Sequence, residues 1–224
     1  TGTNPGSNPQ AAQITGSDGN FYGTTSGGGT SNLGTIYKMT PAGVLTSLIS
    51  FTGTTGANLG SAPQAPLTLG TDGNYYGTTT TGGTGGGFGT VFKMSSAGVL
   101  TTLVHFTGTA GATLGSVPSG VLVQGADGNF YGVTSAGGVS NVGTVFKMTP
   151  AGAFTHLASF TGAAGALLGS APTGGLFAGR DGCFYGVTSG GGLYSQGVLF
   201  RLTPDGVVTT LYSFSGRSEG LTPN

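Results

Sequence analysis

The sequence predicts an all-β fold, a β-propeller of four four-stranded antiparallel blades. A motif of the form DGNFYG occurs four times, and its Asp residues are separated by 54, 55 and 54 residues. A fixed period of this length is typical of a repeat architecture. Each unit divides at Gly, Pro, Asn and Asp into four short runs rich in β-branched and aromatic residues, and none of them shows helical spacing. Each unit therefore predicts one blade.

The second repeat shows the expected strands, which read APLTLGTDG, NYYGTTTTGG, GTVFKMSSAG and VLTTLVHFTG. In the last run, simple alternation predicts Val99 and Leu103 on one face and Leu100, Val104 and Phe106 on the other. A blade packs between two neighbouring blades, so it needs apolar side chains on both faces. This pattern supports a propeller in which the blades bury one another.

The repeats define the expected domain organisation. We expect one propeller domain over residues 1–224, with blades at about 9–53, 63–108, 118–162 and 172–216 and irregular end segments at 1–8 and 217–224. The ends of the chain are compatible with closure of the ring within one chain and with exchange between chains. The sequence thus leaves open a four-bladed monomer and half of an eight-bladed dimer.

An Asp-Gly pair follows the first run of every repeat and predicts a tight hairpin turn, because Gly adopts a positive φ at little cost. One carboxylate in each blade is too few oxygens for a calcium loop, and four carboxylates spread around a ring are too far apart for a glycosidase pair. The turn residues are Asp18, Asp72, Asp127 and Asp181.

An aromatic pair follows each of these turns, beginning with Phe21 and Tyr22. Alternation along the strand directs the two rings to opposite faces, where we expect them to fill the gaps between blades. A cation also recurs once in each repeat, at Lys38, Lys93, Lys147 and Arg201, and we expect it to pair with a turn Asp.

The pattern DGNFYGTTSGGG, then GTVFKMTPAG, then LxSFTG resembles the GloVer tandem repeats, which are Gly-, Leu- and Val-rich bacterial repeats found in proteins with varied surface anchors. The resemblance runs through all four units. It implies an exported, propeller-like protein and brings no catalytic motif with it. We therefore expect a secreted or cell-surface bacterial protein.

The long connections of each repeat are expected on the rim opposite the short turns. Loops on a rigid scaffold are where binding usually occurs. The neutral polar and aromatic side chains there are the candidate ligand-binding residues, with plain solvated loops as the alternative: Asn32, Asn58, Phe88, Asn141, Tyr194, Ser195 and Gln196.

The composition restricts the classes of partner. Only 5% of the residues are charged and the net charge is zero, so no basic surface for nucleic acid is expected. No apolar run approaches the roughly 20 residues of a membrane span. The single cysteine, Cys183, occupies a position that is Asn in the other repeats, and neither His105 nor His156 recurs. We expect no cofactor, no metal and no catalytic residue.

Two functions fit the sequence. The first is a non-enzymatic exported propeller that serves surface structure or protein interaction, with a homo-oligomer or filament formed through the termini. The second is a carbohydrate-binding lectin with repeated sites on the long-loop rim. Its ligand would be a glycan, whereas the first function requires a protein ligand.

Overall fold

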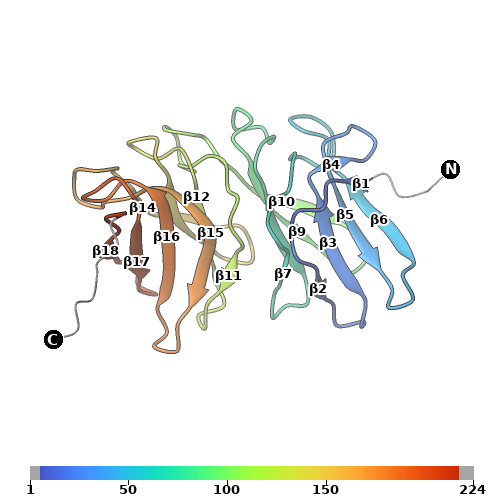
Figure 1. Cartoon of the computed structure of the whole chain (residues 1–224). Helices are drawn as coiled ribbons and strands as arrows, with labels where there is room; N and C mark the ends of the chain where they lie inside the picture. Colours follow the sequence, from blue (N-terminus) through green and yellow to red (C-terminus); the bar gives the residue numbers. More distant parts are fainter. Residues whose placement is uncertain (1–5, 217–224) are drawn as a thin grey trace.

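The computed structural model describes residues 6–216, and it confirms the predicted fold of four four-stranded antiparallel blades (Figure 1). Blade 1 contains β2 (Ile14–Thr15), β3 (Phe21–Thr25), β5 (Thr35–Met39) and β6 (Leu45–Ser50). Blade 2 contains β7 (Thr68–Leu69), β8 (Tyr75–Thr79), β9 (Thr90–Met94) and β10 (Leu100–His105). Blade 3 contains β11 (Val123–Gln124), β12 (Phe130–Thr134), β13 (Thr144–Met148) and β14 (Phe154–Ser159). Blade 4 contains β15 (Ser170–Ala178), β16 (Phe184–Gly190), β17 (Val198–Leu202) and β18 (Val208–Ser213).

A small additional ladder joins the beginning of the described chain to blade 1. In it, β1 (Gly6–Ser7) pairs with β4 (Gly27–Gly28), which lies in the long loop after β3. Most of the expected end segment 1–8, and all of 217–224, lie outside the described residues. No helix among residues 6–216 is long and apolar enough to cross a bilayer.

The last strand of each blade departs from simple alternation. The register of β10 against β9 skips Leu103, so this strand carries a β-bulge. Leu103 and Val104 therefore both pack toward blade 3 with Phe106, whereas Leu100 packs toward blade 1. The predicted grouping of Leu100 with Val104 was wrong because one inserted residue reverses the parity of every side chain that follows it.

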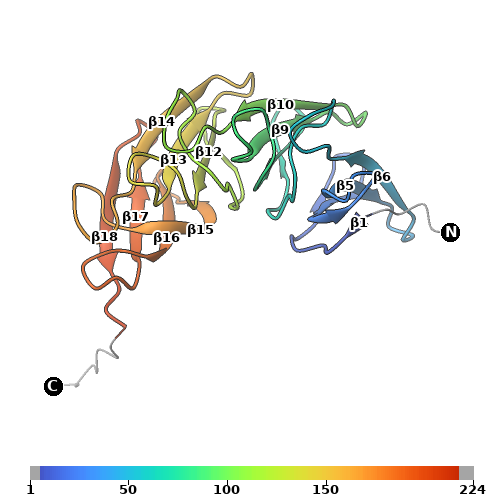
Figure 2. The same cartoon turned by 90° about the horizontal axis from the view of Figure 1, so that it is seen from above.

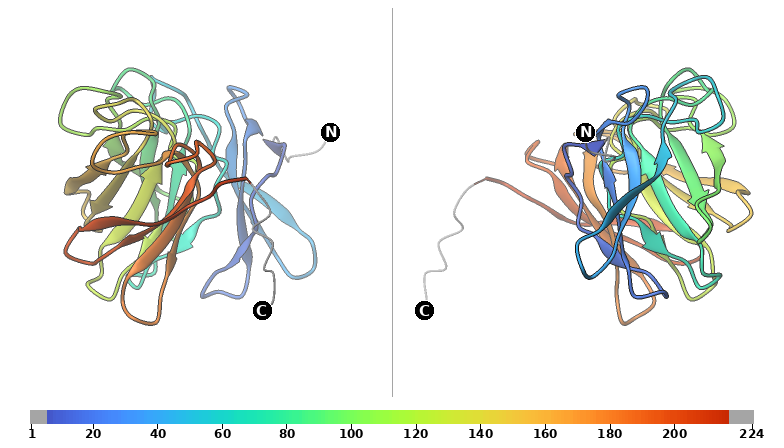
Figure 3. Two further views of the ribbon diagram at one scale, coloured as in Figure 1. Left: turned by 60° about the vertical axis from the view of Figure 1, so that its left-hand side comes forward. Right: turned by 90° about the vertical axis from the view of Figure 1, so that its right-hand side faces the viewer.

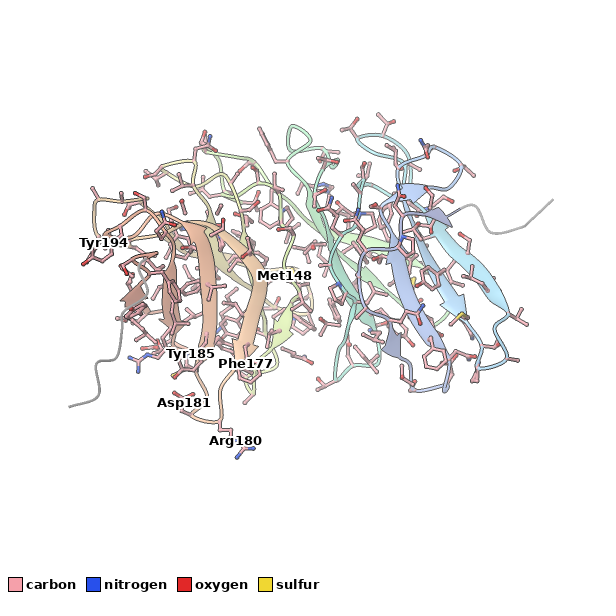
Figure 4. All side chains as sticks on the ribbon, viewed as in Figure 1. Met148, Phe177, Arg180, Asp181, Tyr185 and Tyr194 are labelled. Carbon is pink, nitrogen blue, oxygen red and sulfur yellow. The ribbon has the colours of Figure 1, made fainter. Side chains whose placement is uncertain are left out.

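The core consists of three apolar clusters, one at each junction between successive blades. The aromatic pairs fill these junctions as expected, except that Phe21 and Tyr185 lie on the outer faces of blades 1 and 4 and belong to no junction cluster. Tyr22 stacks on Tyr75 with 4.2 Å between ring centroids, and Tyr131 lies 4.2 Å from Phe184. Met148 is fully buried at the central junction (Figure 4).

The four blades form an open arc and not a ring (Figure 2). Blade 1 and blade 4 lie at the two tips, and none of the three core clusters joins them. The outermost strands, β6, β10, β14 and β18, follow the convex side. The structure therefore leaves one sheet face uncovered at each tip.

The connections sort onto two rims, as the hairpin topology requires. The short turns gather along the lower edge of the arc, and the long loops gather along the upper edge (Figures 1 and 3). The turn Asp residues and the candidate loop residues thus lie at opposite ends of each blade.

Candidate interaction face

The turn carboxylates already accept hydrogen bonds from residues of their own repeat. In blade 3, Asp127 accepts hydrogen bonds from the Asn129 amide at 3.1 Å and from the Tyr131 hydroxyl at 2.8 Å. The Lys147 ammonium lies 2.9 Å from the same carboxylate and 5.4 Å from the Tyr131 ring centroid. Asp127 thus shapes its own hairpin and accepts from the hydroxyl of a tyrosine that lies between blades 3 and 4.

The other three blades repeat this arrangement with differences in the cation. Asp18 pairs with Lys38 at 2.8 Å, but no ion pair within 4 Å joins Asp72 to Lys93 or Asp181 to Arg201. In every blade the tyrosine hydroxyl donates to the Asp, at Tyr22, Tyr76, Tyr131 and Tyr185. These contacts leave the carboxylates little capacity for a ligand.

Acid should therefore destabilise the fold through these turns. Burial alone would raise the pKa of Asp127, but hydrogen bonds from Asn129, Lys147 and Tyr131 hold it well below its usual range. Since the pKa is lowered in the folded state, the carboxylate stabilises the protein above the unfolded pKa of about 3.9, and this stabilisation is lost as the pH falls below that value. Urea unfolding of the wild type should show falling stability from about pH 5 downward.

The control for this prediction is Asp127→Asn, which keeps a turn-capping oxygen and removes the titrating charge. Its free energy of unfolding should be lower than that of the wild type at neutral pH, and the gap should narrow in acid. A gap that stays constant from neutral pH to about pH 2 would contradict the assignment.

The asparagines proposed for ligand binding are used within their own loops. The side-chain oxygen of Asn32 accepts from the Gly28 amide at 3.0 Å, and Asn141 accepts from Gly137 at 3.1 Å. Both residues have a φ of 56°, a left-handed conformation that Asn tolerates well. The Asn58 amide donates to the Ser50 carbonyl at 3.2 Å. These contacts give the three asparagines a role in loop shape.

The remaining loop candidates do not converge on one place. Phe88 is 40% exposed, and a Cβ on Gly108 would meet its ring at 3.0 Å, so the ring lies over the chain leaving blade 2. Tyr194, Ser195 and Gln196 share one exposed loop of blade 4. Tyr194 lies at the end of blade 4 opposite to Arg180 and Asp181 (Figure 4).

The two histidines and the cysteine also lie apart from one another. In blade 2, His105 accepts from the Thr84 amide at 3.2 Å, and in blade 3 His156 lies 3.0 Å from the Ser159 hydroxyl of the same strand, β14. Burial lowers the pKa of both imidazoles and raises the pKa of the Cys183 thiol. Within residues 6–216, no three His, Cys, Asp or Glu side chains gather as a metal site.

The most unusual surface of the described chain is the uncovered face of blade 4, which the sequence analysis missed. We call it the blade 4 end face, and its apolar members are Phe177, Tyr185, Val187, Leu211, Tyr212 and Phe214. Phe177 is 73% exposed and points away from the sheet near Tyr185 (Figure 4). A groove of about 460 Å³ on this face is lined in part by Phe177, Tyr185 and Val187, and a second of the same volume lies along β18 beside Leu211 and Tyr212. Exposed apolar patches are typical of interaction sites.

The other three blades bury the residues at two of these repeat positions. Phe214 is 43% exposed, whereas its counterparts Phe51, Phe106 and Phe160 are fully buried. Val187 is 42% exposed, whereas its counterpart Val133 is 2% exposed. The exposure therefore does not come from a change in the repeat, because these side chains differ from their counterparts only in that no blade of residues 6–216 covers them.

The uncovered face of blade 1 is more polar. We call it the blade 1 end face, defined by Gln13, Phe21, Tyr37, Met39 and Leu45. Gln13 stands where the other blades have a buried leucine, and its side-chain amide donates to the Tyr37 hydroxyl at 2.9 Å. Together with Thr25 and Thr35, these two side chains line a cavity of about 250 Å³.

Comparison with known sequences gives one family match. The model of the Gloeobacter/Verrucomicrobia repeat matches residues 1–168 and, in a second overlapping match, residues 112–224. No curated protein matches the sequence. The repeat model thus covers the entire chain, in agreement with the resemblance found from the motifs.

Solved structures with a similar fold include several lyases. Virginiamycin B lyase from Staphylococcus aureus has a TM-score of 0.62 and 16% identity over 96% of this chain and 58% of its own. A streptogramin B lyase has a TM-score of 0.55 and 16% identity over 90% of this chain and 53% of its own. An ulvan lyase, solved bound to -[GlcA(1-4)Rha3S]-, has a TM-score of 0.57 and 10% identity over 94% of this chain and 57% of its own.

These neighbours overturn the expectation that the chain is not an enzyme. That expectation rested on the sequence alone, whereas proteins named as lyases share this fold. At 10 to 16% identity the likeness shows the fold alone and transfers no activity to this chain. The chain spans a little over half the length of these neighbours.

Proposed function

Because the chain belongs to the Gloeobacter/Verrucomicrobia repeat family, we propose that it is a protein-binding scaffold that docks a further β-sheet on the blade 4 end face. One observation carries the proposal. A phenylalanine that is fully buried in three repeats, as at Phe160, is 43% exposed at Phe214. Sheets that pack face to face bury apolar side chains between them, and this face has the side chains but lacks the second sheet.

The local structure supports a sheet as the partner. The bulge in β18 skips Leu211, as the bulge in β10 skips Leu103. Leu103 packs on the next blade, where a Cβ on Gly152 would meet it at 3.3 Å. Leu211 is presented in the same way and is 46% exposed. A blade of the same repeat therefore fits this face better than an unrelated shape.

We propose further that this scaffold works outside the bacterial cell or on its surface. Its solvated residues are mainly Thr, Ser, Asn and Gly, and only 5% of the chain is charged. Such a composition suits an exported repeat protein, and the family description names bacterial groups. Recovery of the protein in the culture medium or the cell envelope would support the location, and exclusive recovery in the cytosol would contradict it.

Association should depend on the blade 4 end face. Phe214→Asp places a charge where an apolar contact is required, so this variant should remain at the mass of one chain, 21.7 kDa, at concentrations where the wild type is heavier. Light scattering coupled to size exclusion measures this mass directly.

The matched control for this variant is Val99→Asp. Val99 is 64% exposed in the turn between β9 and β10, away from both tips of the arc. The control should associate as the wild type does. A wild type that stays at one chain mass at all concentrations, or a Phe214→Asp variant that associates normally, would contradict the proposal.

A further inference from the structure

We infer that the partner on the blade 4 end face is blade 1 of a second copy of this chain, and that two arcs close head to tail into one eight-bladed ring. The inference rests on the proposed function and names its partner. Blade 1 of each copy would take the place of the missing fifth blade of the other. The two new junctions would then repeat the three junctions that each chain already contains.

The blade 1 end face has the side chains that such a junction requires. At the junction of blades 1 and 2, the side chains supplied by blade 2 include Tyr75, Phe92 and Met94, all at most 1% exposed. Blade 1 has Phe21, Tyr37 and Met39 at these same three repeat positions, on its uncovered face. Phe21 and Met39 are only half-buried there. One chain thus supplies both halves of a junction, but the arc holds these halves apart.

The segment before blade 1 already has the conformation of a blade-to-blade connection. Asn8 has a φ of 55°, and its counterparts Ala62, Val117 and Ala171 have φ values of 52°, 53° and 49°. In the three connections this unusual backbone lets the amide donate to a carbonyl of the preceding blade. The bonds are Ala62 to Leu33 at 2.8 Å, Val117 to Phe88 at 3.0 Å, and Ala171 to Val142 at 2.8 Å.

The Asn8 carbonyl accepts from the Ser26 amide of blade 1 at 3.1 Å, but no blade precedes blade 1 in the described chain, so the Asn8 amide lacks the carbonyl that the other three connections use. In the head-to-tail ring, its amide would donate to the Gln196 carbonyl of the second copy. Gln196 occupies the repeat position of Leu33 and Val142 and is exposed. We therefore assign Gly6–Pro9 as a strap that docks on the long loop of blade 4.

A glycine in the turn between the last two strands gives independent support. Cβ atoms on Gly152 and Gly206 would meet leucines of the preceding blade at 3.3 Å and 2.9 Å. A Cβ on Gly43, the counterpart in blade 1, would meet nothing within 4 Å. Leu211 of a second copy would fill this space. The blade 1 turn therefore has an open position that matches the exposed leucine of blade 4.

The number of copies follows from the size of propellers. Known propellers close with about four to eight blades, and a head-to-tail interface gives a ring only when the rotation closes. One four-bladed arc does not close in this structure (Figure 2), and three would give about twelve blades, beyond the usual range. Two copies give a ring of eight.

Cysteine cross-linking tests the order of the blades. We would introduce Asn8→Cys and Gln196→Cys separately, each on a Cys183→Asn background that restores the residue found in the other repeats. Main-chain atoms at the equivalent positions Ala62 and Leu33 are 2.8 Å apart, so a thiol pair there is within reach of a disulfide or a short bis-maleimide. A mixture of the two variants should form a cross-linked dimer, and neither variant alone should do so.

Mass measurement completes the test, with thermal melting to confirm that the variants remain folded. The wild type should have twice the mass of one chain, and a double Asn8→Cys, Gln196→Cys variant should oxidise to a covalent dimer. Four results would overturn the inference: a disulfide within one chain, a ladder of larger multimers, a cross-link formed by Gln196→Cys alone, or a heavier assembly without any cross-link. Of these four results, only the disulfide within one chain would also contradict protein binding by the blade 4 end face. A wild type that remains monomeric removes the proposed function as well.

Discussion

Replacing Phe160 with alanine should lower the free energy of unfolding by about 3 to 5 kcal/mol. Phe160 is fully buried, and its ring centroid lies 5.1 Å from that of Phe200 in an edge-to-face arrangement. It belongs to the cluster that holds blade 3 against blade 4. Removing the ring deletes apolar contacts on both sides of a junction and leaves a cavity there, because the two sheets cannot easily move together. Guanidinium unfolding followed by circular dichroism measures the loss.

Phe214→Ala is the matched control, since it makes the same change at the same position of the repeat. Phe214 is 43% exposed and makes a ring contact only with Tyr212 of its own strand among the described aromatic pairs. Removing the Phe214 ring should lower the free energy of unfolding by less than about 1 kcal/mol, when unfolding is measured below the concentration at which chains associate. Equal costs at the two positions would mean that the blade 4 end face is covered within a single chain.

The sequence predicted those features of the fold that depend on neighbours in the chain. The Asp-Gly turns and the opposite directions of Phe21 and Tyr22 follow from local backbone chemistry. Because the sequence repeats every 54 or 55 residues, the same features occur in all four blades. The bulge at Leu103 was missed because β10, which reads LTTLVH, mixes polar and apolar residues without strict alternation, so a one-residue insertion leaves no mark in the pattern.

The candidate site could not be predicted in the same way. Phe214 stands in the same repeat pattern as Phe160, so no local reading distinguishes the exposed ring from the buried one. The difference arises from the tertiary arrangement, because no blade within residues 6–216 packs on this face of blade 4. The loop candidates failed to converge for a related reason: Asn32 and Asn141 are polar because their loops need a side-chain acceptor.

A second large loss of stability is expected for Gly137→Ala, at about 2 to 5 kcal/mol. Gly137 has a φ of 76°, and a Cβ there would lie 2.5 Å from the carbonyl carbon of Gly115 and 2.6 Å from the Ser116 amide nitrogen. Both are main-chain atoms of the connection that enters blade 3, so neither can rotate away as a side chain could. The added methyl group must push this connection off the blade. Chemical denaturation measures the cost.

Gly128→Ala separates the two causes of that loss. Gly128 has the same φ of 76°, but a Cβ there would meet nothing within 4 Å, so this variant bears only the conformational cost of about 1 to 2 kcal/mol. The difference between the two variants therefore measures how firmly the connection is held against the blade. The strap occupies the corresponding place on blade 1, where Gly6 pairs with Gly28, so the same kind of contact fixes the strap on its own chain and lets Asn8 dock on a second copy. If Gly137→Ala lowers the free energy of unfolding no more than Gly128→Ala does, the connections are easily displaced from their blades. A strap bound in this way would be too weakly held to join two arcs.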